Sequence, residues 1–167
     1  MRTPPHDEFR RNMKRHPPTN IDVEKAVRQV IADRPTFAVV ERDEAWSMAL
    51  RTFFSRQSKY GNFVEDRLAE IVRLDHRRLG NRFDLIAELV NHKPAAVLWH
   101  VDALPAIEVL QCVRRLRSVF PGCRQGVAGR RLGNVDRMRF MAAGADATLR
   151  HPEDLWSVAR LLAPGLR

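Results

Sequence analysis

The stretch PAAVLWHVDALP, residues 94–105, decides the fold of this chain. Its apolar run ends in two polar side chains, His100 and Asp102, and a proline closes the stretch on each side. A short continuous apolar run between turn signals is typical of a buried strand in a parallel sheet. The stretch therefore predicts a strand that brings a histidine and a carboxylate to one edge of a sheet.

Strand and helix patterns alternate on both sides of this stretch. The run TFAVV, residues 36–40, predicts a second buried strand, and apolar residues at helical spacing follow it over residues 43–56. The remaining strands are expected at residues 123–129 and 145–152, and the remaining helices at residues 82–92, 106–120, 134–144 and 153–165. This alternation predicts an α/β fold with a doubly wound, five-stranded parallel sheet and helices on both faces.

The segment between residues 57 and 81 allows two interpretations. FVEDRLAEIVRL, residues 63–74, has apolar positions that fit a helix, but its last residues, 71–74, also fit a short strand. We predict the strand, because the sheet otherwise lacks a member.

The first 34 residues differ in composition from the rest of the chain. Residues 1–20 combine paired prolines with several cations and few aliphatic side chains, which predicts a basic, flexible arm. Residues 21–34 carry a partial apolar face after a capping Thr19 or Asn20, and they predict an extra helix that ends before Pro35. Residues 35–167 then form the sheet domain.

Length and composition exclude several classes of protein. A chain of 167 residues is long enough for one domain with a substantial core. Its longest apolar run, residues 95–99, is too short to span a bilayer, and no signal peptide is visible. We expect a cytoplasmic protein without membrane contact, in which Cys112 and Cys123 stay reduced.

The charge of the chain points to polyanions as possible partners. Lysine and arginine outnumber acidic residues by 29 to 20, a formal net charge of +9. Such a charge attracts nucleic acid, although a GC-rich genome produces the same arginine bias without a partner. The candidate contacts to a phosphate backbone are Arg10, Arg11, Lys14, Arg15, Arg114, Arg115, Arg130, Arg131 and Arg137. Aromatic residues for base stacking are absent among them, so a solvated helical surface is the alternative.

Three blocks of sequence resemble the response-regulator receiver domain, and they cover most of residues 36–164. These blocks are residues 39–54, 93–117 and 141–162. The third is the most specific, because Ala-Gly-Ala-Asp is followed six residues later by Pro152. The resemblance implies a CheY-like, flavodoxin-like sheet with strand order 2-1-3-4-5. It also implies a regulatory role in signal transduction.

The resemblance also implies a phosphorylation site, but the residues at its positions depart from the family. Receiver domains gather Mg²⁺ with carboxylates and attack a phosphoryl donor with an aspartate. The acidic pair falls on Glu41 and Arg42, followed by Asp43, and the fixed charge of Arg42 competes with a metal ion. The phosphoacceptor position, four residues before Pro105, falls on Val101, which carries no nucleophile.

The other positions of the expected site depart as well. The hydroxyl position falls on Ala128 or Gly129, the lysine position on His151, and the aromatic switch position on Thr148. Asp102 is the residue that could still accept a phosphoryl group. Successive side chains of a strand point to opposite faces of the sheet, so Asp102 would point away from the side of Val101 unless the strand ends there. The resemblance therefore implies a pseudo-receiver: a receiver fold without phosphotransfer, not an enzyme, and without a cofactor.

The polar residues that follow the strand ends suggest a further hypothesis. These residues are Glu41, Asp43, His100, Asp102 and His151. They could hold a transition metal, or the carboxylates could pair with Arg42 and Arg150 while Asp43 caps the next helix. Because no metal motif of fixed spacing supports the first interpretation, we predict no metal site.

The expected interaction surface consists of the fourth helix, the fifth strand and the fifth helix of the receiver-like domain. Trp156 lies outside the apolar stripe of the last helix and marks this surface as a contact for a protein partner or a second copy of the chain. The alternative function is a nucleic-acid-associated protein that binds the phosphate backbone through its arm and its arginines.

Overall fold

The computed structural model describes residues 35–57, 69–75 and 82–155 of the chain. These residues belong to one compact unit, Pro35–Arg167. The basic arm, the helix predicted over residues 21–34 and nearly all of the last predicted helix, Trp156 included, lie outside the described residues. Within the described part, no helix is both long and apolar enough to cross a membrane.

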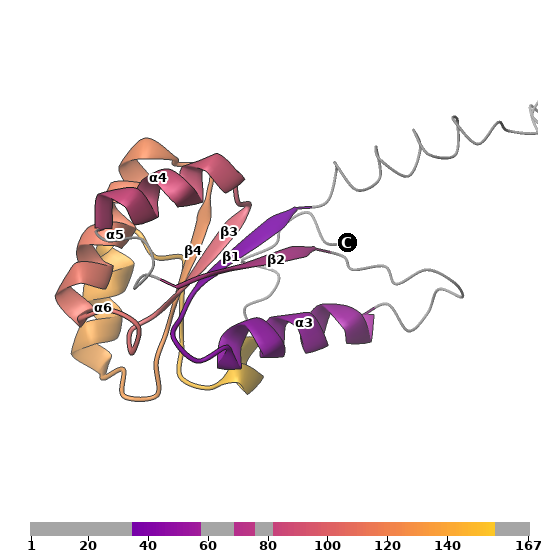
Figure 1. Cartoon of the computed structure of the whole chain (residues 1–167). Helices are drawn as coiled ribbons and strands as arrows, with labels where there is room; N and C mark the ends of the chain where they lie inside the picture. The colour runs from indigo at the N-terminus through magenta and orange to yellow at the C-terminus, as the bar shows by residue number, and fades with distance from the viewer. Residues whose placement is uncertain (1–34, 58–68, 76–81, 156–167) are drawn as a thin grey trace, which may run out of the picture. The chain divides into compact units, whose positions relative to one another are not determined.

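Five parallel strands form one sheet in the order β2-β1-β3-β4-β5 (Figure 1). They are β1 (Thr36–Val40), β2 (Glu70–Leu74), β3 (Ala96–His100), β4 (Arg124–Ala128) and β5 (Ala147–Leu149). Each neighbouring pair is parallel. The predicted flavodoxin-like order is confirmed, and so is the strand, rather than a helix, at residues 71–74.

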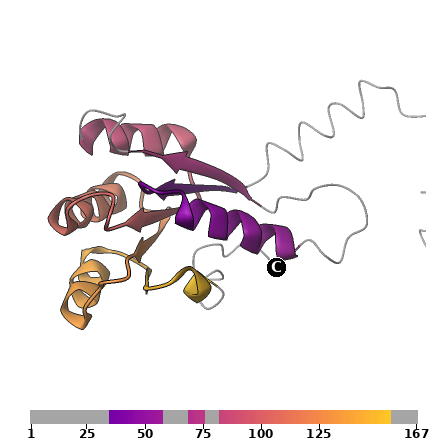
Figure 2. The ribbon, with the colours of Figure 1, turned by 60° about the horizontal axis from the view of Figure 1, so that its bottom comes forward.

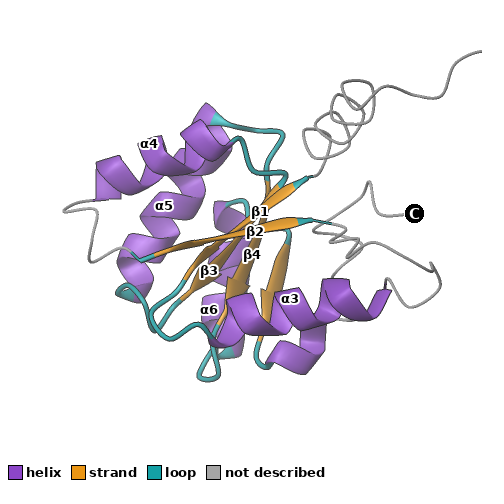
Figure 3. Ribbon diagram, turned by 45° about the vertical axis from the view of Figure 1, so that its right-hand side comes forward, coloured by secondary structure: helices purple, strands orange, loops and turns teal. Residues whose placement is uncertain are grey.

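Helices cover both faces of the sheet. α4 (Arg82–His92), α5 (Ala106–Val119) and α6 (Asn134–Ala143) lie on one face, and α3 (Ala45–Gln57) lies on the other (Figures 2 and 3). A short 3-10 helix, η3 (Pro152–Asp154), follows β5. Helices connect successive parallel strands, so the carboxyl ends of all the strands lie at the same edge of the sheet. The loops that follow the strands lie at this edge too.

Alternation along the central strand divides the core into two layers. Val97 and Trp99 pack with the residues of α4, α5 and α6, whereas Ala96 and Leu98 pack with those of α3. All five side chains of β3 are buried, as its continuous apolar run predicts. His100 continues the alternation of Ala96 and Leu98 and therefore lies on the α3 face.

A polar network at the amino ends of β4 and β5 holds the Ala-Gly-Ala-Asp turn. The Asp146 carboxylate accepts a hydrogen bond from the backbone amide of Gln125 at 2.8 Å. It also forms ion pairs with Arg117 at 2.7 Å and Arg124 at 2.9 Å. Burial alone would raise the pKa of Asp146, but these three donors outweigh it and hold that pKa below its ordinary value. Gly144 ends α6 at a φ of 109°, in the left-handed region that favours glycine.

Candidate functional site

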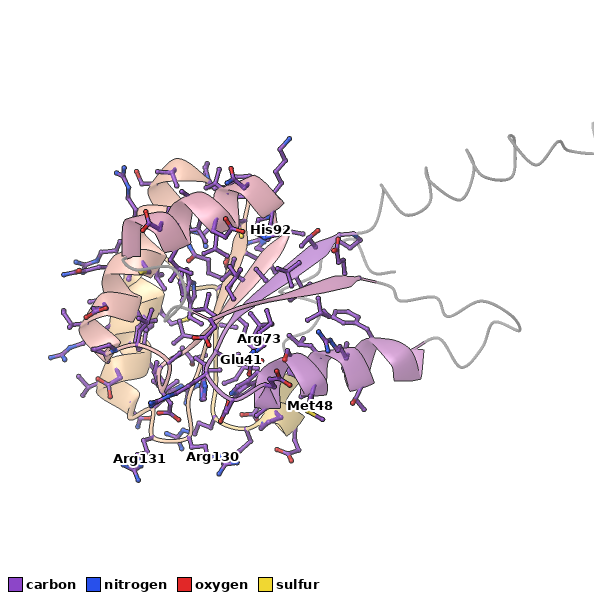
Figure 4. All side chains as sticks on the ribbon, in the orientation of Figure 1. Glu41, Met48, Arg73, His92, Arg130 and Arg131 are labelled. Carbon is purple, nitrogen blue, oxygen red and sulfur yellow. The ribbon has the colours of Figure 1, made fainter. Side chains whose placement is uncertain are left out.

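Of the polar residues predicted at the sheet edge, Glu41 and Asp43 follow β1, His100 ends β3, Asp102 follows it, and His151 precedes η3. A pocket of about 150 Å³ opens between these segments. Its lining includes Asp43, Trp46, His100, Asp102, Arg130 and Pro152. Figure 4 labels Glu41, Arg73 and Arg130 among the side chains of this edge.

Glu41 follows β1 directly and holds the start of α3. Its side chain is completely buried, and its two oxygens accept from the backbone amides of Trp46 at 2.8 Å and Ser47 at 3.0 Å. The first amides of a helix lack partners within the helix and favour a negative charge. The interpretation without a metal offered Asp43 for this capping role, but Glu41 takes it. The side chain of Asp43 is 62% exposed and faces His100 instead.

A cation that the sequence did not single out compensates the buried carboxylate. Arg73 of β2 donates from Nη2 to the carbonyl oxygen of Arg42 at 2.9 Å, and its Nη1 lies 3.2 Å from Glu44. Its Nε lies 3.8 Å from Glu41 (Figure 4). Arg42 was expected to pair with one of the strand-end carboxylates; its side chain is exposed, and its contact with Arg73 is made through its carbonyl oxygen. The register of β2 against β1, which pairs Arg73 with Val39, is the signal that could have located this cation.

The side chain of Val101 occupies the space in which a side chain at residue 129 would begin. The resemblance assigns these two positions to the phosphoacceptor and the hydroxyl of a receiver. Val101 donates its backbone amide to Ala128 at 2.9 Å, and its side chain packs against the core cluster of α4, α5 and α6. A β-carbon on Gly129 would overlap Cγ2 of Val101. Glycine is therefore needed at residue 129 while valine occupies residue 101.

His100 lies between two exposed carboxylates. Its Nε2 is 3.3 Å from Asp102, and its Nδ1 is 3.9 Å from Asp43, which is too long for a hydrogen bond. The buried Nδ1 has no hydrogen-bond partner among the described residues. β3 ends at His100, so Asp102 belongs to a turn, where the alternation of a strand no longer sets its direction. The ring of Trp46 lies 6.0 Å from the His100 ring.

The lysine position of the receiver family is part of a turn in this chain. His151 is exposed and precedes η3. The Asp154 carboxylate accepts from the backbone amides of His151 at 3.0 Å and Arg150 at 2.8 Å, and these bonds lower the pKa of Asp154. The expected ion pair between the Arg150 side chain and a strand-end carboxylate is not present among the described residues, where the backbone amide of Arg150 donates to Asp154 instead.

The donor set at this edge does not fit the Mg²⁺ site of a receiver domain. Glu41 is already engaged by two amides and Arg73, and Val101 supplies no oxygen. The carboxylates of Asp43 and Asp102 lie beside His100 and are 62% and 60% exposed. Within residues 35–57, 69–75 and 82–155, no three histidine, cysteine or acidic side chains gather as a metal site. Mg²⁺ requires several oxygen ligands in near-octahedral geometry.

The arginines between residues 114 and 139 divide into two groups. Arg117 and Arg124 belong to the network around Asp146. The candidate polyanion contacts that the structure describes are all exposed: Arg114, Arg115, Arg130, Arg131 and Arg137. Figure 4 shows Arg130 and Arg131 near each other on the loop after β4. The four candidates of the basic arm lie outside the described residues.

The two cysteines are structural. Cys112 of α5 and Cys123 before β4 are free and buried. Burial raises the pKa of Cys123 to about 12, against the opposing effect of the nearby Arg117 charge. A thiol with this pKa supplies almost no thiolate near neutral pH and is a poor nucleophile.

Comparison with known proteins bears on the fold. No protein-family model and no curated protein matches the chain. A response regulator from Thermotoga maritima has a TM-score of 0.61 at 17% identity, covering 79% of this chain and 99% of that chain. A CheY-like protein (tadZ) from Pseudomonas aeruginosa has a TM-score of 0.58 at 15% identity, covering 80% of this chain and 97% of that chain.

A third solved structure belongs to the same class. The receiver domain of the putative response regulator NarL from Mycobacterium tuberculosis has a TM-score of 0.54 at 13% identity, covering 79% of this chain and 98% of that chain. This chain therefore has the fold of CheY-like receiver domains. At such low identity the likeness concerns the fold, and chemistry must be argued from the residues of this chain.

Proposed function

We propose that this chain is a pseudo-receiver: a cytoplasmic, non-enzymatic regulatory module of signalling that acts by binding protein and needs no phosphorylation. The receiver fold supports the regulatory role. The contact between Val101 and Gly129 carries the rest of the proposal. Where a receiver accepts and holds a phosphoryl group, this chain packs a valine against a glycine, and neither residue offers an oxygen from its side chain.

The surroundings of Glu41 support the same proposal. A receiver changes its charge at this edge when it is phosphorylated. Here the carboxylate of Glu41 is buried, bonded to the first amides of α3 and compensated by Arg73. Charge compensation is thus built into the chain, which favours a single, permanent arrangement of the loop between β1 and α3.

The surface proposed for protein binding lies on α6 and β5. α6 exposes three large apolar side chains, Val135 at 62%, Met138 at 72% and Met141 at 47%. Met138 and Met141 line a hollow of about 760 Å³, together with Arg137 and Thr148. Arg137 donates to the Thr148 hydroxyl at 2.9 Å, which ties α6 to β5. Methionines adapt to varied partners, and such a patch is typical of an interaction surface.

A charged substitution on α6, compared with the same substitution at a methionine on another helix, tests this surface. Met138→Glu places a charge in the patch, whereas Met48→Glu makes the same change at a side chain of α3 that is 60% exposed (Figure 4). Sedimentation equilibrium of the full chain measures self-association, and proximity labelling in cells followed by purified binding assays measures a partner. The proposal predicts that Met138→Glu weakens the complex at least ~10-fold, the effect of a charge forced into an apolar contact. Equal effects of both variants would contradict it.

Nucleic-acid binding is the competing function, and a separate gel-shift experiment tests it. Arg130 and Arg131 are both exposed, so a phosphate backbone could contact them. The protein is tested for a gel shift of random DNA at several salt concentrations. If the shift depends strongly on salt, and if the double variant Arg130→Ala, Arg131→Ala removes it, nucleic-acid binding replaces the protein-binding proposal.

A further inference from the structure

We propose, on the basis of the proposed function, that the hollow between α6 and β5 binds an acidic amphipathic segment of another protein rather than a second copy of this chain. We call this site the α6 hollow and define it by Arg137, Met138, Met141, Asp146 and Thr148, which belong to its lining. Its volume of about 760 Å³ falls within the range of roughly 300–1,000 Å³ that is usual for binding pockets. The α6 hollow therefore has room for several side chains of a partner.

The apolar part of the α6 hollow comes from its two methionines. Met138 is 72% exposed and Met141 is 47% exposed, and the two lie three positions apart, on the same side of the helix. Val135, three positions before Met138, is 62% exposed and continues this apolar strip by one turn. A partner helix with apolar side chains at helical spacing can pack along such a strip.

The polar part of the α6 hollow favours a negative charge. Asp146 contributes a carboxylate to the lining, but this carboxylate already forms ion pairs with Arg117 at 2.7 Å and Arg124 at 2.9 Å. Arg137 donates from Nε to the Thr148 hydroxyl at 2.9 Å, which holds its guanidinium beside the hollow. This bond leaves the two terminal amino groups of the guanidinium for an acceptor from a partner. A carboxylate next to apolar side chains fits this lining.

The surroundings of the α6 hollow carry positive charge as well. Residues 106–144, which form α5, β4 and α6, contain eight arginines and two acidic residues. Apart from Arg117 and Arg124, these arginines are exposed, and Arg139 lies on α6 itself. Such a field attracts an acidic partner before contact. A phosphate backbone would feel the same field, but it has no apolar groups for the exposed methionines.

A symmetric pair of copies would bring like charges together at this site. If two α6 helices packed antiparallel across a two-fold axis at Met138, Arg137 of each copy would lie opposite Arg139 of the other. Like charges that face each other across an interface are unfavourable. The charges on both sides of Met138 therefore disfavour a second copy and favour an acidic partner.

Fluorescence anisotropy of three labelled peptides with the full chain tests this proposal. Each peptide is about 15 residues long, enough for a marginal helix. The acidic probe has leucine at positions i, i+3, i+4 and i+7 and glutamate with alanine at the others. The basic probe has lysine in place of glutamate, and the polar probe has serine in place of leucine.

We expect saturable binding of the acidic probe and binding at least ~10-fold weaker for each of the other two. Absence of binding by the acidic probe, or equal binding of the acidic and basic probes, would overturn the proposal. A polar probe that binds as tightly as the acidic one would reveal a general attraction for polyanions, nucleic acid included, and would also overturn it.

Matched variants locate the bound peptide. Met138→Gln removes an apolar side chain without adding charge and should weaken binding of the acidic probe ~10-fold. Met48→Gln, the same change at a methionine of α3 that is 60% exposed, should leave it unchanged (Figure 4). The double variant Arg137→Glu, Arg139→Glu should prefer the basic probe, whereas Arg42→Glu, at another exposed arginine, should still prefer the acidic one. Wild-type binding by the α6 variants would place the peptide elsewhere and reject the proposal.

Self-association distinguishes a failure of this inference from a failure of the proposed function. Sedimentation equilibrium compares the full chain with Met138→Gln. If the chain forms a dimer that Met138→Gln weakens and the acidic probe does not dissociate, the occupant is a second copy: the α6 surface is retained and the acidic partner is rejected. If neither self-association nor the binding of any probe depends on Met138, the α6 surface of the proposed function fails as well.

Discussion

Two carboxylates at opposite edges of the sheet, Glu41 and Asp146, have the same kinds of partner but different roles. Glu41 accepts from two backbone amides and Asp146 from one, and each forms an ion pair with arginine. Asp146 belongs to the Ala-Gly-Ala-Asp turn, the most specific part of the sequence resemblance to receiver domains. Glu41 belongs to the loop between β1 and α3, at the edge where the carboxyl ends of the strands lie. The comparison indicates that the same polar chemistry preserves the scaffold at one edge and fixes a loop at the other.

The largest effect is expected from removing the carboxylate of Glu41. Glu41→Ala leaves the buried amides of Trp46 and Ser47 without an acceptor, and it should lower the free energy of unfolding by about 3 kcal/mol. Denaturant unfolding of both proteins measures this difference. Glu44→Gln is the control, because it removes only an exposed ion pair with Arg73 and should cost less than ~1 kcal/mol. Equal losses would mean that the buried amides do not depend on Glu41.

The contact between Val101 and Gly129 gives the next largest effect. Gly129→Ala pushes a methyl group into Val101, and overpacking of this kind should cost about 2 kcal/mol of unfolding free energy. Val101→Ala removes the obstructing Cγ2 atom, so the double variant should recover part of the loss relative to the sum of the single variants. A double-mutant cycle measures this coupling, and strictly additive losses would show that the two side chains do not meet.

The network of Asp146 should respond to pH in a defined direction. The folded protein lowers the pKa of Asp146 below its ordinary value of 3.8, so its stabilising contribution is present above that value. The contribution is lost as the pH falls through the lowered pKa of the folded state. Asp146→Asn should therefore cost about 1.5 kcal/mol at neutral pH and progressively less in acid. A difference between the two proteins that stays constant across this range would contradict the assignment.

The smallest effects separate the two arginines near Glu41. Arg73→Ala removes a hydrogen bond to the main chain and two ion pairs, and it should cost about 1 kcal/mol. Arg42→Ala removes an exposed side chain and should change the unfolding free energy by less than ~0.5 kcal/mol. Thermal unfolding at low and high salt ranks the two variants. The reverse ranking would restore Arg42 as the cation of this edge.

The sequence predicted the scaffold well because its signals are local. The apolar run of β3 and the apolar spacing of the helices predict buried strands and one-sided helices without knowledge of their partners. β4 was harder to recognise, because it contains the polar Gln125. The structure explains this residue: its side chain accepts from Trp99 at 3.0 Å and donates to the Val113 carbonyl at 3.1 Å.

The site could be predicted only in part because its contacts join distant strands. That Val101 carries no nucleophile, at the position that the resemblance assigns to the phosphoacceptor, can be read from the sequence alone. The partner of Glu41 is not, since Arg73 lies 32 residues later on a strand whose register had to be known. The choice between Asp43 and Glu41 as the cap of α3 depended on the path of the loop between them, which no local propensity determines.

Intact-mass spectrometry of the full chain after incubation with a small acyl phosphate and Mg²⁺ tests whether this chain lacks phosphotransfer. We expect no increase by the mass of a phosphoryl group, in the wild type or in Asp102→Ala. An acid-stable, base-labile adduct that forms on the wild type and disappears in Asp102→Ala would contradict it, because the turn after β3 would then have kept the phosphoacceptor that Val101 lacks.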